Sequence, residues 1–466
     1  MHKRITAMIQ RKNIISLIIA IAFFMEMLDS TIVVTAVSKM ADYFGINFSY
    51  INLAITAYAT SIAVFLLIAP WVSNRVGDKN TYVLSIAVFS FGSLLCGLST
   101  NILMLVFAEI IQGVGGALMV PVGRTIIFKQ TPKDQYLKAI AWMVWPALIA
   151  PVIGPVLGAY IVKYSSWRYM FFINIPIGVV LSVLSIFLLD NTKTSVIEKK
   201  SFDFKGFVIL AILIMSVIFL LESCLKDSIF RSYRSIFIVG LIVTSLLSVI
   251  HYKKSKNHIV NISALRIHSF RSSIINSTFF RITTGAMPFV IPLYFQQALG
   301  FSAIKAGSLL LIMFIGNLGA KVFVNRLIKI FGSELVISIG SIVQMISVAM
   351  ILTITQASPL FYISIILLVN GAIRSVLFTA YMSRVFIDVP KPNLNDANAI
   401  NNILFQLTFG MAVSLSAILL NWFFNTFSVN TAFDITIIIF AILAFIPTIL
   451  GFLFKKKIIK QDYLYQ

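Results

Sequence analysis

Two carboxylates lie three residues apart inside the first long apolar stretch of this chain. Glu26 and Asp29 belong to the run FFMEMLDST, residues 23–31, and on a helix that spacing places both on one face. In a bilayer, an ionised acid that faces lipid costs about 3 kcal/mol. If this helix spans a membrane, we therefore expect the acidic face to look into a cavity, where it can bind protons or substrate.

The composition indicates a membrane protein. Of the 466 residues, 59% are hydrophobic and only 11% are charged, too few charges to cover a water-soluble surface. The apolar run 14–36 is long enough to span a bilayer and has no cleavage site, so we do not expect a removable signal peptide. Cys96 and Cys224 both fall in apolar helix and predict no disulfide.

Windows of about 20 apolar residues predict fourteen spans. Because lipid offers the backbone no hydrogen-bond partners, these spans must be helices, and the expected class is an all-α polytopic membrane protein. The predicted spans are 14–36, 50–72, 81–99, 102–127, 139–162, 168–189, 207–225, 234–251, 273–298, 304–325, 335–354, 359–384, 399–420 and 433–454.

The net charge of +21 is explained by how Lys and Arg residues are distributed between the two sides of the membrane. If the N-terminus is cytoplasmic, 26 of the 37 Lys and Arg residues fall on the cytoplasmic side, seven fall outside and four lie within spans. This is the positive-inside pattern, and it predicts cytoplasmic termini in a bacterial inner membrane rather than nucleic-acid binding. The exception is the loop with Lys226, Arg231 and Arg234, on the external side.

Weak internal matches predict a duplicated six-helix unit. The expected domains are an N-terminal six-helix bundle (1–189), a linker with two additional helices (190–272) and a C-terminal six-helix bundle (273–466). The matching dipeptides are Gln112-Gly113 with Asn370-Gly371 and Pro132-Lys133 with Pro390-Lys391, each 258 positions apart, and Asn74-Arg75 with Asn325-Arg326, 251 positions apart.

Seven charged residues lie inside predicted spans and should line a cavity or pair with one another. Those near a helix end could instead extend to the membrane surface, an alternative that applies to Arg124 and Lys321 and in part to Arg281. By helical rise, Asp29 and Glu109 share a depth of roughly 10 Å below the outer face, whereas the bases lie in the cytoplasmic half. The acids are Glu26, Asp29 and Glu109, and the bases are Arg124, Arg281, Lys321 and Arg374.

Five runs resemble the motifs of the fourteen-span drug:proton antiporters of the major facilitator superfamily, in that family's order and spacing. The resemblance implies two six-helix bundles with two inserted helices, and proton-coupled export. The runs are LDSTIV (28–33), WVSNRVGDK (71–79), IQGVGGA (111–117), GPVLGA (154–159) and SWRYMFFINIPIG (166–178).

The same resemblance implies a gating role for residues of three motifs and for Arg124. Gly154 and Gly158, four apart, also leave one helix face bare for a neighbouring helix, and Pro155 bends that helix, although glycines serve ordinary packing in any bundle. The basic loop motif could brace a helix end or could simply be solvated. The implied gating residues are Asn74, Arg75, Gly77, Lys79, Gln112, Gly113, Arg124, Gly154, Pro155 and Gly158.

Two residues depart from the family pattern. Asn74 replaces an acidic residue of the loop motif, and Glu109 stands where relatives usually carry Arg. Two or three carboxylates that lie close together in a low dielectric cannot all ionise easily. We therefore expect Glu26, Asp29 and Glu109, with Arg281 and Arg374, to form a proton-coupling and substrate cavity.

Other energy sources and chemistries have no signature in the sequence. No G-x-x-x-x-G-K-[ST] phosphate loop indicates ATP binding, and no H-E-x-x-H or cysteine cluster predicts a metal site. We expect no cofactor other than the proton gradient and no catalytic residues. The predicted function is proton-coupled export (antiport) of drugs or other small amphiphilic compounds by alternating access, carried out by a monomeric secondary transporter whose partners are its substrate, protons and membrane lipid. The alternatives are export of an organic anion or metal–anion complex and, more remotely, a membrane-embedded enzyme.

Overall fold

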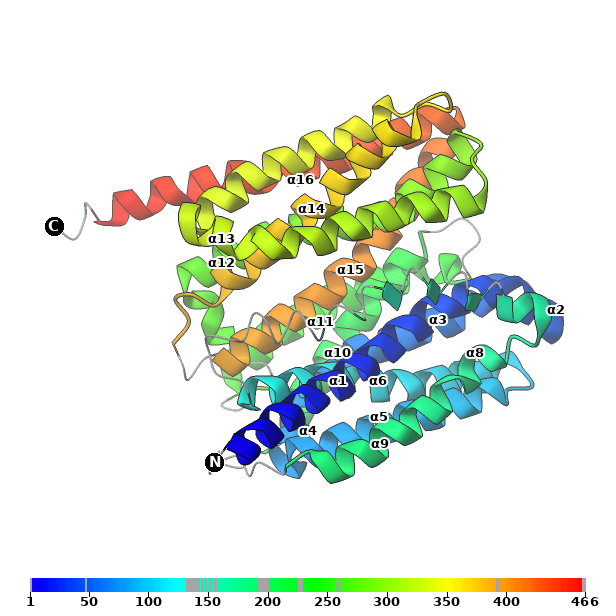
Figure 1. Ribbon diagram of the computed structural model, residues 1–466, viewed down its shortest axis with the longest axis vertical. Coiled ribbons are helices and arrows are strands. Elements are labelled where there is room, and N and C mark those ends of the chain that lie inside the picture. The colour runs from blue at the N-terminus through cyan, green and yellow to red at the C-terminus, as the bar shows by residue number, and fades with distance from the viewer. Residues whose placement is uncertain are drawn as a thin grey trace. The chain divides into compact units, whose positions relative to one another are not determined.

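The computed structural model of the protein is built from helices (Figure 1). It describes residues 2–46, 48–130, 160–190, 201–224, 229–255, 258–259, 262–390 and 394–462, with residues 143, 146, 149–150, 153–154 and 157–158 between the second and third ranges. No strand occurs in these ranges. Eleven described helices are long and apolar enough to cross a membrane, so the predicted all-α membrane architecture is confirmed.

The fourteen predicted spans are consistent with these helices. One apolar helix, Lys305–Thr353, covers two predicted spans. The predicted span 273–298 falls largely on a helix, His268–Leu293, whose Ser, Thr, Asn and Arg side chains lower its hydropathy. The predicted span 139–162 lies mostly outside the described residues.

The chain divides into two compact units, and the first comprises Met1–Ser223 with Asp227–Ile259. In it α5 packs against α6 and α9, α3 packs against α6, and α10 pairs with α11. Its helices are α1 (His2–Ile32), η1 (Val33–Ala36), α2 (Val37–Phe44), α3 (Phe48–Phe65), η2 (Leu66–Ile68), α4 (Ala69–Val76), α5 (Asp78–Gly97), α6 (Ile102–Gln130), α8 (Tyr169–Phe172), α9 (Asn174–Leu188), α10 (Phe204–Glu222), η4 (Arg231–Tyr233) and α11 (Arg234–Lys254).

The second unit comprises Cys224–Lys226 with Val260–Gln466. In it α13 packs against α14 and α16, and α12 packs against α15 and α16. Its helices are η5 (Ile262–Arg266), α12 (His268–Leu293), the π-helical η6 (Tyr294–Ala298), α13 (Ala303–Ala349), η7 (Met350–Thr353), α14 (Leu360–Val385), α15 (Leu394–Phe424) and α16 (Val429–Asp462).

Four glycines in the left-handed region of φ mark backbone turns that recur in the two units. Gly45 (φ 65°) and Gly300 (φ 67°) lie 255 positions apart, and so do Gly77 (φ 91°) and Gly332 (φ 75°). A side chain is strained at positive φ, so each turn favours glycine. Gly332 also divides α13 into two helices. The two units thus place the same turns at the same spacing.

The first membrane span is not one uninterrupted α-helix. The 3₁₀ segment η1 separates α1 from α2, inside the predicted span 14–36. The Thr31 hydroxyl donates to the Met27 carbonyl at 2.9 Å, and the Thr35 hydroxyl donates to the Ile32 carbonyl at 2.7 Å. Such back-bonding by threonine often bends helices, and it occurs here where the helix tightens.

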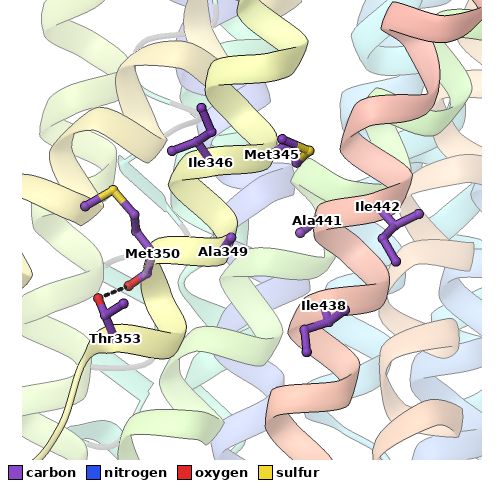
Figure 2. A pocket seen from close by; sticks show the side chains of 8 residues that line it. All are labelled: Met345, Ile346, Ala349, Met350, Thr353, Ile438, Ala441 and Ile442. Atoms are coloured by element: carbon purple, nitrogen blue, oxygen red, sulfur yellow. Dashed lines mark hydrogen bonds between the residues drawn. The ribbon is translucent and has the colours of Figure 1, made fainter.

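Two grooves on the helices are apolar. Figure 2 shows the groove between α13 and α16, with Met345, Ile346 and Met350 on one side and Ile438 and Ile442 on the other. Its volume is about 420 Å³. A second groove of about 380 Å³ lies between α1 and α9. Neither contains a predicted site residue, and their apolar linings suit contact with lipid chains.

Candidate functional site

The three intramembrane acids of the first unit come together in the structure. Glu26 and Asp29 on α1 and Glu109 on α6 are 4%, 2% and 3% exposed. Asp29 lies close enough to interact electrostatically with both Glu26 and Glu109, and Tyr58 of α3 interacts with all three. We call Glu26, Asp29 and Glu109 the acidic cluster.

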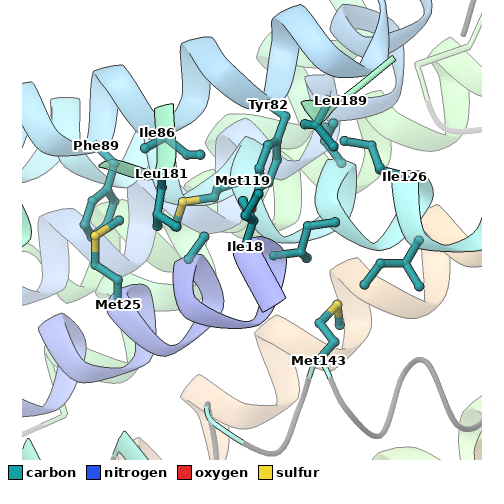
Figure 3. Packing of buried hydrophobic residues seen from close by; sticks show 14 of the residues in the cluster. Ile18, Met25, Tyr82, Ile86, Phe89, Met119, Ile126, Met143, Leu181 and Leu189 are labelled. Atoms are coloured by element: carbon teal, nitrogen blue, oxygen red, sulfur yellow. The ribbon is translucent and has the colours of Figure 1, made fainter. Parts of the chain in front are cut away.

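The acidic cluster lies between two apolar cores. On one side α1 contributes residues from Ile15 to Met25, and Figure 3 shows Met25 beside Phe89 in this core, with Tyr82 and Met119 packed nearby. The other core begins on α1 at Ile32 and includes Cys96, Ala108 and Phe171. A polar layer is thus enclosed within apolar helices, which keeps the local dielectric low.

One amide side chain holds Asp29. The Asn174 Nδ2 atom on α9 donates to the Asp29 carboxylate at 2.5 Å and is 2.9 Å from the Ser93 hydroxyl of α5. Ser93 in turn donates to the Phe171 carbonyl at 2.8 Å. Gln112 of α6 lies beside Asp29 as well and accepts a hydrogen bond from the Cys96 thiol at 3.3 Å. The network connects α1, α5, α6 and α9 through neutral groups.

Glu26 and Glu109 have fewer hydrogen-bond partners among the described residues than Asp29 has. Among the described residues, none of the three acids forms an ion pair, and the Glu26 Oε2 and Tyr58 hydroxyl oxygens have no hydrogen-bond partner. Gly116 of α6 borders this space: a Cβ atom there would stand 3.6 Å from Glu26 Cγ and 3.4 Å from the Tyr58 hydroxyl. Three ionised carboxylates in so buried a site would repel one another, so the cluster is suited to binding a proton or a cation.

Glycines bring the fifth span against α1 next to this cluster. A Cβ atom on Gly154 would stand 2.4 Å from the Thr31 hydroxyl, and one on Gly158 would stand 2.2 Å from the Thr35 hydroxyl. A larger residue at Gly154 would have to displace the Thr31 side chain, and one at Gly158 would also meet the Ile32 carbonyl oxygen at 2.9 Å. The predicted close helix approach is present, while Pro155 lies outside the described residues.

Gln112 and Gly113 of the fourth-span motif lie on α6, and so does Arg124 further along the chain, but the three residues have different contacts. Gly113 allows α6 to approach α3, since its Cβ atom would stand 2.8 Å from the Tyr58 carbonyl. Arg124 lies fifteen residues beyond Glu109 on the same helix, about 22 Å by helical rise. That is too far for an ion pair between them, and Arg124 is outside the acidic cluster.

The loop motif is built around a residue that the sequence reasoning missed. Asp78, 2% exposed, accepts a hydrogen bond from the Ser73 hydroxyl and lies 2.5 Å from Lys129 Nζ at the end of α6. Asn74, Arg75 and Lys79 were predicted here; Asn74 and Arg75 are exposed and Lys79 half-buried, and Arg75 packs over the Trp71 ring at 5.4 Å. The signal was an acid at the first position of a helix, directly after Gly77.

The basic residues of the second unit are held differently. Arg281 of α12, 3% exposed, donates to the Asn401 side-chain oxygen at 2.5 Å and lies over the Phe405 ring at 5.4 Å. Arg374 of α14 has a buried Nη1 atom without a hydrogen-bond partner among the described residues. Lys321 of α13 is half-buried. Neither arginine forms an ion pair within the described part of the chain.

Sequence reasoning also missed the amides that hold these charges. Asn174 and Asn401 were not singled out, although each is a fully buried amide on an apolar helix, which is itself a signal. Tyr58 was missed because a tyrosine within an apolar span does not stand out in the sequence. The contacts of all three are visible only once helices distant in sequence are placed together.

Comparisons with known proteins agree on one family. A family model described as Major Facilitator Superfamily matches residues 19–413. The chain is 31% identical over 406 residues to proteins named "Putative multidrug resistance protein MdtD" from Salmonella heidelberg and Salmonella typhimurium, covering 87% of this chain and 86% of each relative. It is also similar in fold to the crystal structure of the human organic anion transporter MFSD10 (TETRAN), with a TM-score of 0.65 and 12% identity over 94% of this chain and 99% of that one.

Proposed function

Because this chain belongs to the Major Facilitator Superfamily of membrane transporters, we propose that it exports drugs or other small amphiphilic compounds in exchange for protons. In this proposal two helical bundles rock around a site within the membrane. The chain acts as a monomer in the bacterial inner membrane with both termini in the cytoplasm. The name of the similar MdtD proteins supports multidrug export.

The observation that carries the proposal is the acidic cluster. Asp29 is buried, held by the neutral Asn174 amide and near Glu26 and Glu109, without an ion pair among the described residues. Acids arranged in this way can exchange a proton for a cationic or polar substrate group. We assign proton coupling to Asp29 and Glu109, and contact with substrate to Glu26.

A second candidate is export of an organic anion or a metal–anion complex. Arg374 supports it, because its buried Nη1 atom has no partner among the described residues and could donate to a carboxylate or phosphate. Under this proposal substrate would bind to the second unit. In this candidate function the energy source would still be the proton gradient, and the substrate would leave chemically unchanged.

Reconstitution in liposomes tests the proposal. An imposed proton gradient should drive a fluorescent cationic dye against its concentration gradient, and a dye gradient should in turn move protons, as an enclosed pH indicator would report. A labelled dicarboxylate in the same vesicles tests the anion candidate. Dye movement that does not respond to the proton gradient would exclude proton antiport. Chemical change of a recovered substrate would indicate an enzyme.

A further inference from the structure

A histidine–carboxylate cluster lies apart from the acidic cluster, at the base of the α10–α11 hairpin. Asp203 immediately precedes α10, His251 lies in the last turn of α11, and His258 follows α11. One possible ligand atom from each of the three residues lies within 4.8 Å of the other two. The His251 Nε2 atom is 2.9 Å and 3.0 Å from the two Asp203 carboxylate oxygens.

Surrounding groups fix the orientation of these side chains. The Asp203 carboxylate accepts hydrogen bonds from the Gly206 backbone N–H at 2.9 Å and the Ile259 backbone N–H at 3.2 Å. The Tyr252 ring stacks on His258 with ring centroids 4.5 Å apart and planes inclined by 25°. Outer groups of this kind orient the ligands of known metal sites. The three candidate ligands are half-buried, so an ion in solution can reach them.

We propose that Asp203, His251 and His258 bind a divalent transition-metal ion of the zinc class. Two imidazoles and one carboxylate suit Zn²⁺, Co²⁺ or Ni²⁺, whereas Mg²⁺ and Ca²⁺ prefer oxygen ligands. Zinc bonds of about 2.0–2.1 Å in a tetrahedron separate ligand atoms by about 3.4 Å. Asp203 and His251 are already near that separation, and His258, which lies outside the helices, needs only a small movement.

The bound ion would connect the start of α10 to the end of α11. One ligand precedes the start of α10 and the other two lie at the end of α11 and just after it. These two helix ends meet at the base of the hairpin, so a metal there would hold the two helices together. Water would complete the coordination. The competing explanation is that Asp203 and His251 form only an ion pair at a helix terminus, with His258 close by without a role.

Metal titration of the full chain tests the site without measuring transport. The protein is purified in detergent with a histidine-free tag, stripped with a chelator and titrated with Zn²⁺ by calorimetry. Co²⁺ absorption in the visible range reports the geometry. We expect one Zn²⁺ per chain and a rise in the unfolding temperature on binding. His258→Ala should weaken binding at least tenfold, and His251→Ala should do the same. His2→Ala is the matched control, which should bind as the wild type does.

Each contrary result is decisive. Wild-type protein that binds no stoichiometric zinc overturns the site. Equal affinity in His258→Ala shows that His258 is not a ligand and overturns the three-residue site. Loss of binding in His2→Ala alone places the metal at the N-terminus and also overturns the proposal. Because His258 contributes no helix cap, the His258→Ala chain should remain folded, which size-exclusion chromatography checks.

Discussion

The membrane interior of the first unit is acidic, and the matching positions of the second unit are neutral or basic. At the 255-residue spacing of the positive-φ glycines, Glu26 corresponds to Arg281 and Asp29 corresponds to Thr284. At the 258-residue spacing of the Gln-Gly and Asn-Gly dipeptides, Gly116 beside Glu26 corresponds to Arg374. The two units therefore have backbone turns at matching positions and differ in the charge of corresponding side chains.

The packing around these positions is similar in both units. Gln112 accepts from Cys96 across the α5–α6 pair, and Asn370 donates to Ser347 across the α13–α14 pair. Cβ atoms on Gly113 and on Gly371 would each collide with a neighbouring helix, at the Tyr58 carbonyl and the Met313 carbonyl respectively. Glycines and amides therefore occupy corresponding helix contacts in both units, whereas the charged side chains differ between the units.

The largest expected effect separates Asp29 from its counterpart Thr284. Asp29→Asn should reduce proton-driven dye efflux to background while the protein still inserts, because an amide cannot carry a proton through the cycle. Thr284→Val, at the corresponding position, should keep most of the activity. Efflux from inverted vesicles under an imposed pH gradient measures both. Full pH-dependent efflux in Asp29→Asn would remove this residue from the mechanism.

The next effect concerns the amide that holds each buried charge. Asn174→Ala and Asn401→Ala should each lower the free energy of unfolding by about 1–3 kcal/mol, because each removes a side-chain hydrogen-bond partner from a buried ionisable group. Only Asn174→Ala should also change the pH profile of transport, since only Asn174 contacts Asp29. Thermal unfolding in detergent and vesicle efflux give the two readings. Equal changes in pH profile for both variants would contradict different roles for the two units.

A smaller difference is expected between two ion pairs that join neighbouring helices. Lys129–Asp78 in the first unit has an acid with a 3% exposed side chain, whereas Arg384–Glu334 in the second has an acid with a 57% exposed side chain. Asp78→Asn should lower the free energy of unfolding by about 1–3 kcal/mol, and Glu334→Gln by less than about 1 kcal/mol. Added salt should weaken only the exposed pair. Equal losses would show that burial does not distinguish them.

The smallest effect is a shift in pH dependence. Glu109→Arg would place a cation beside Asp29 and favour its charged form, so the pH optimum of transport should move to lower pH. Any preference for cationic substrates should weaken. Glu109→Gln, which removes charge without adding it, is the control and should shift the optimum less. A folded Glu109→Arg protein with an unchanged pH profile would contradict the interaction with Asp29.

The sequence predicted the membrane helices because each apolar run is long and must satisfy its own backbone. It also singled out Glu26, Asp29 and Glu109, which the structure brings together, since charged residues stand out in an apolar sequence. It did not predict the Asn174 contact, because that contact joins helices 145 residues apart. The Asp203, His251 and His258 cluster was missed for the same reason: 48 residues separate its first two members, and no recognised metal-ligand spacing appears.

The four-residue segment η1 has a mechanical consequence for the first span. A 3₁₀-helix rises about 2.0 Å per residue with three residues per turn, whereas an α-helix rises about 1.5 Å with 3.6. Conversion of Val33–Ala36 to α-helix would shorten the span by about 2 Å and turn α2 by about 80° about the helix axis. Since η1 begins one turn after Asp29, this conversion would combine a shift along the helix axis with a rotation of α2, directly beside the Asp29 carboxylate.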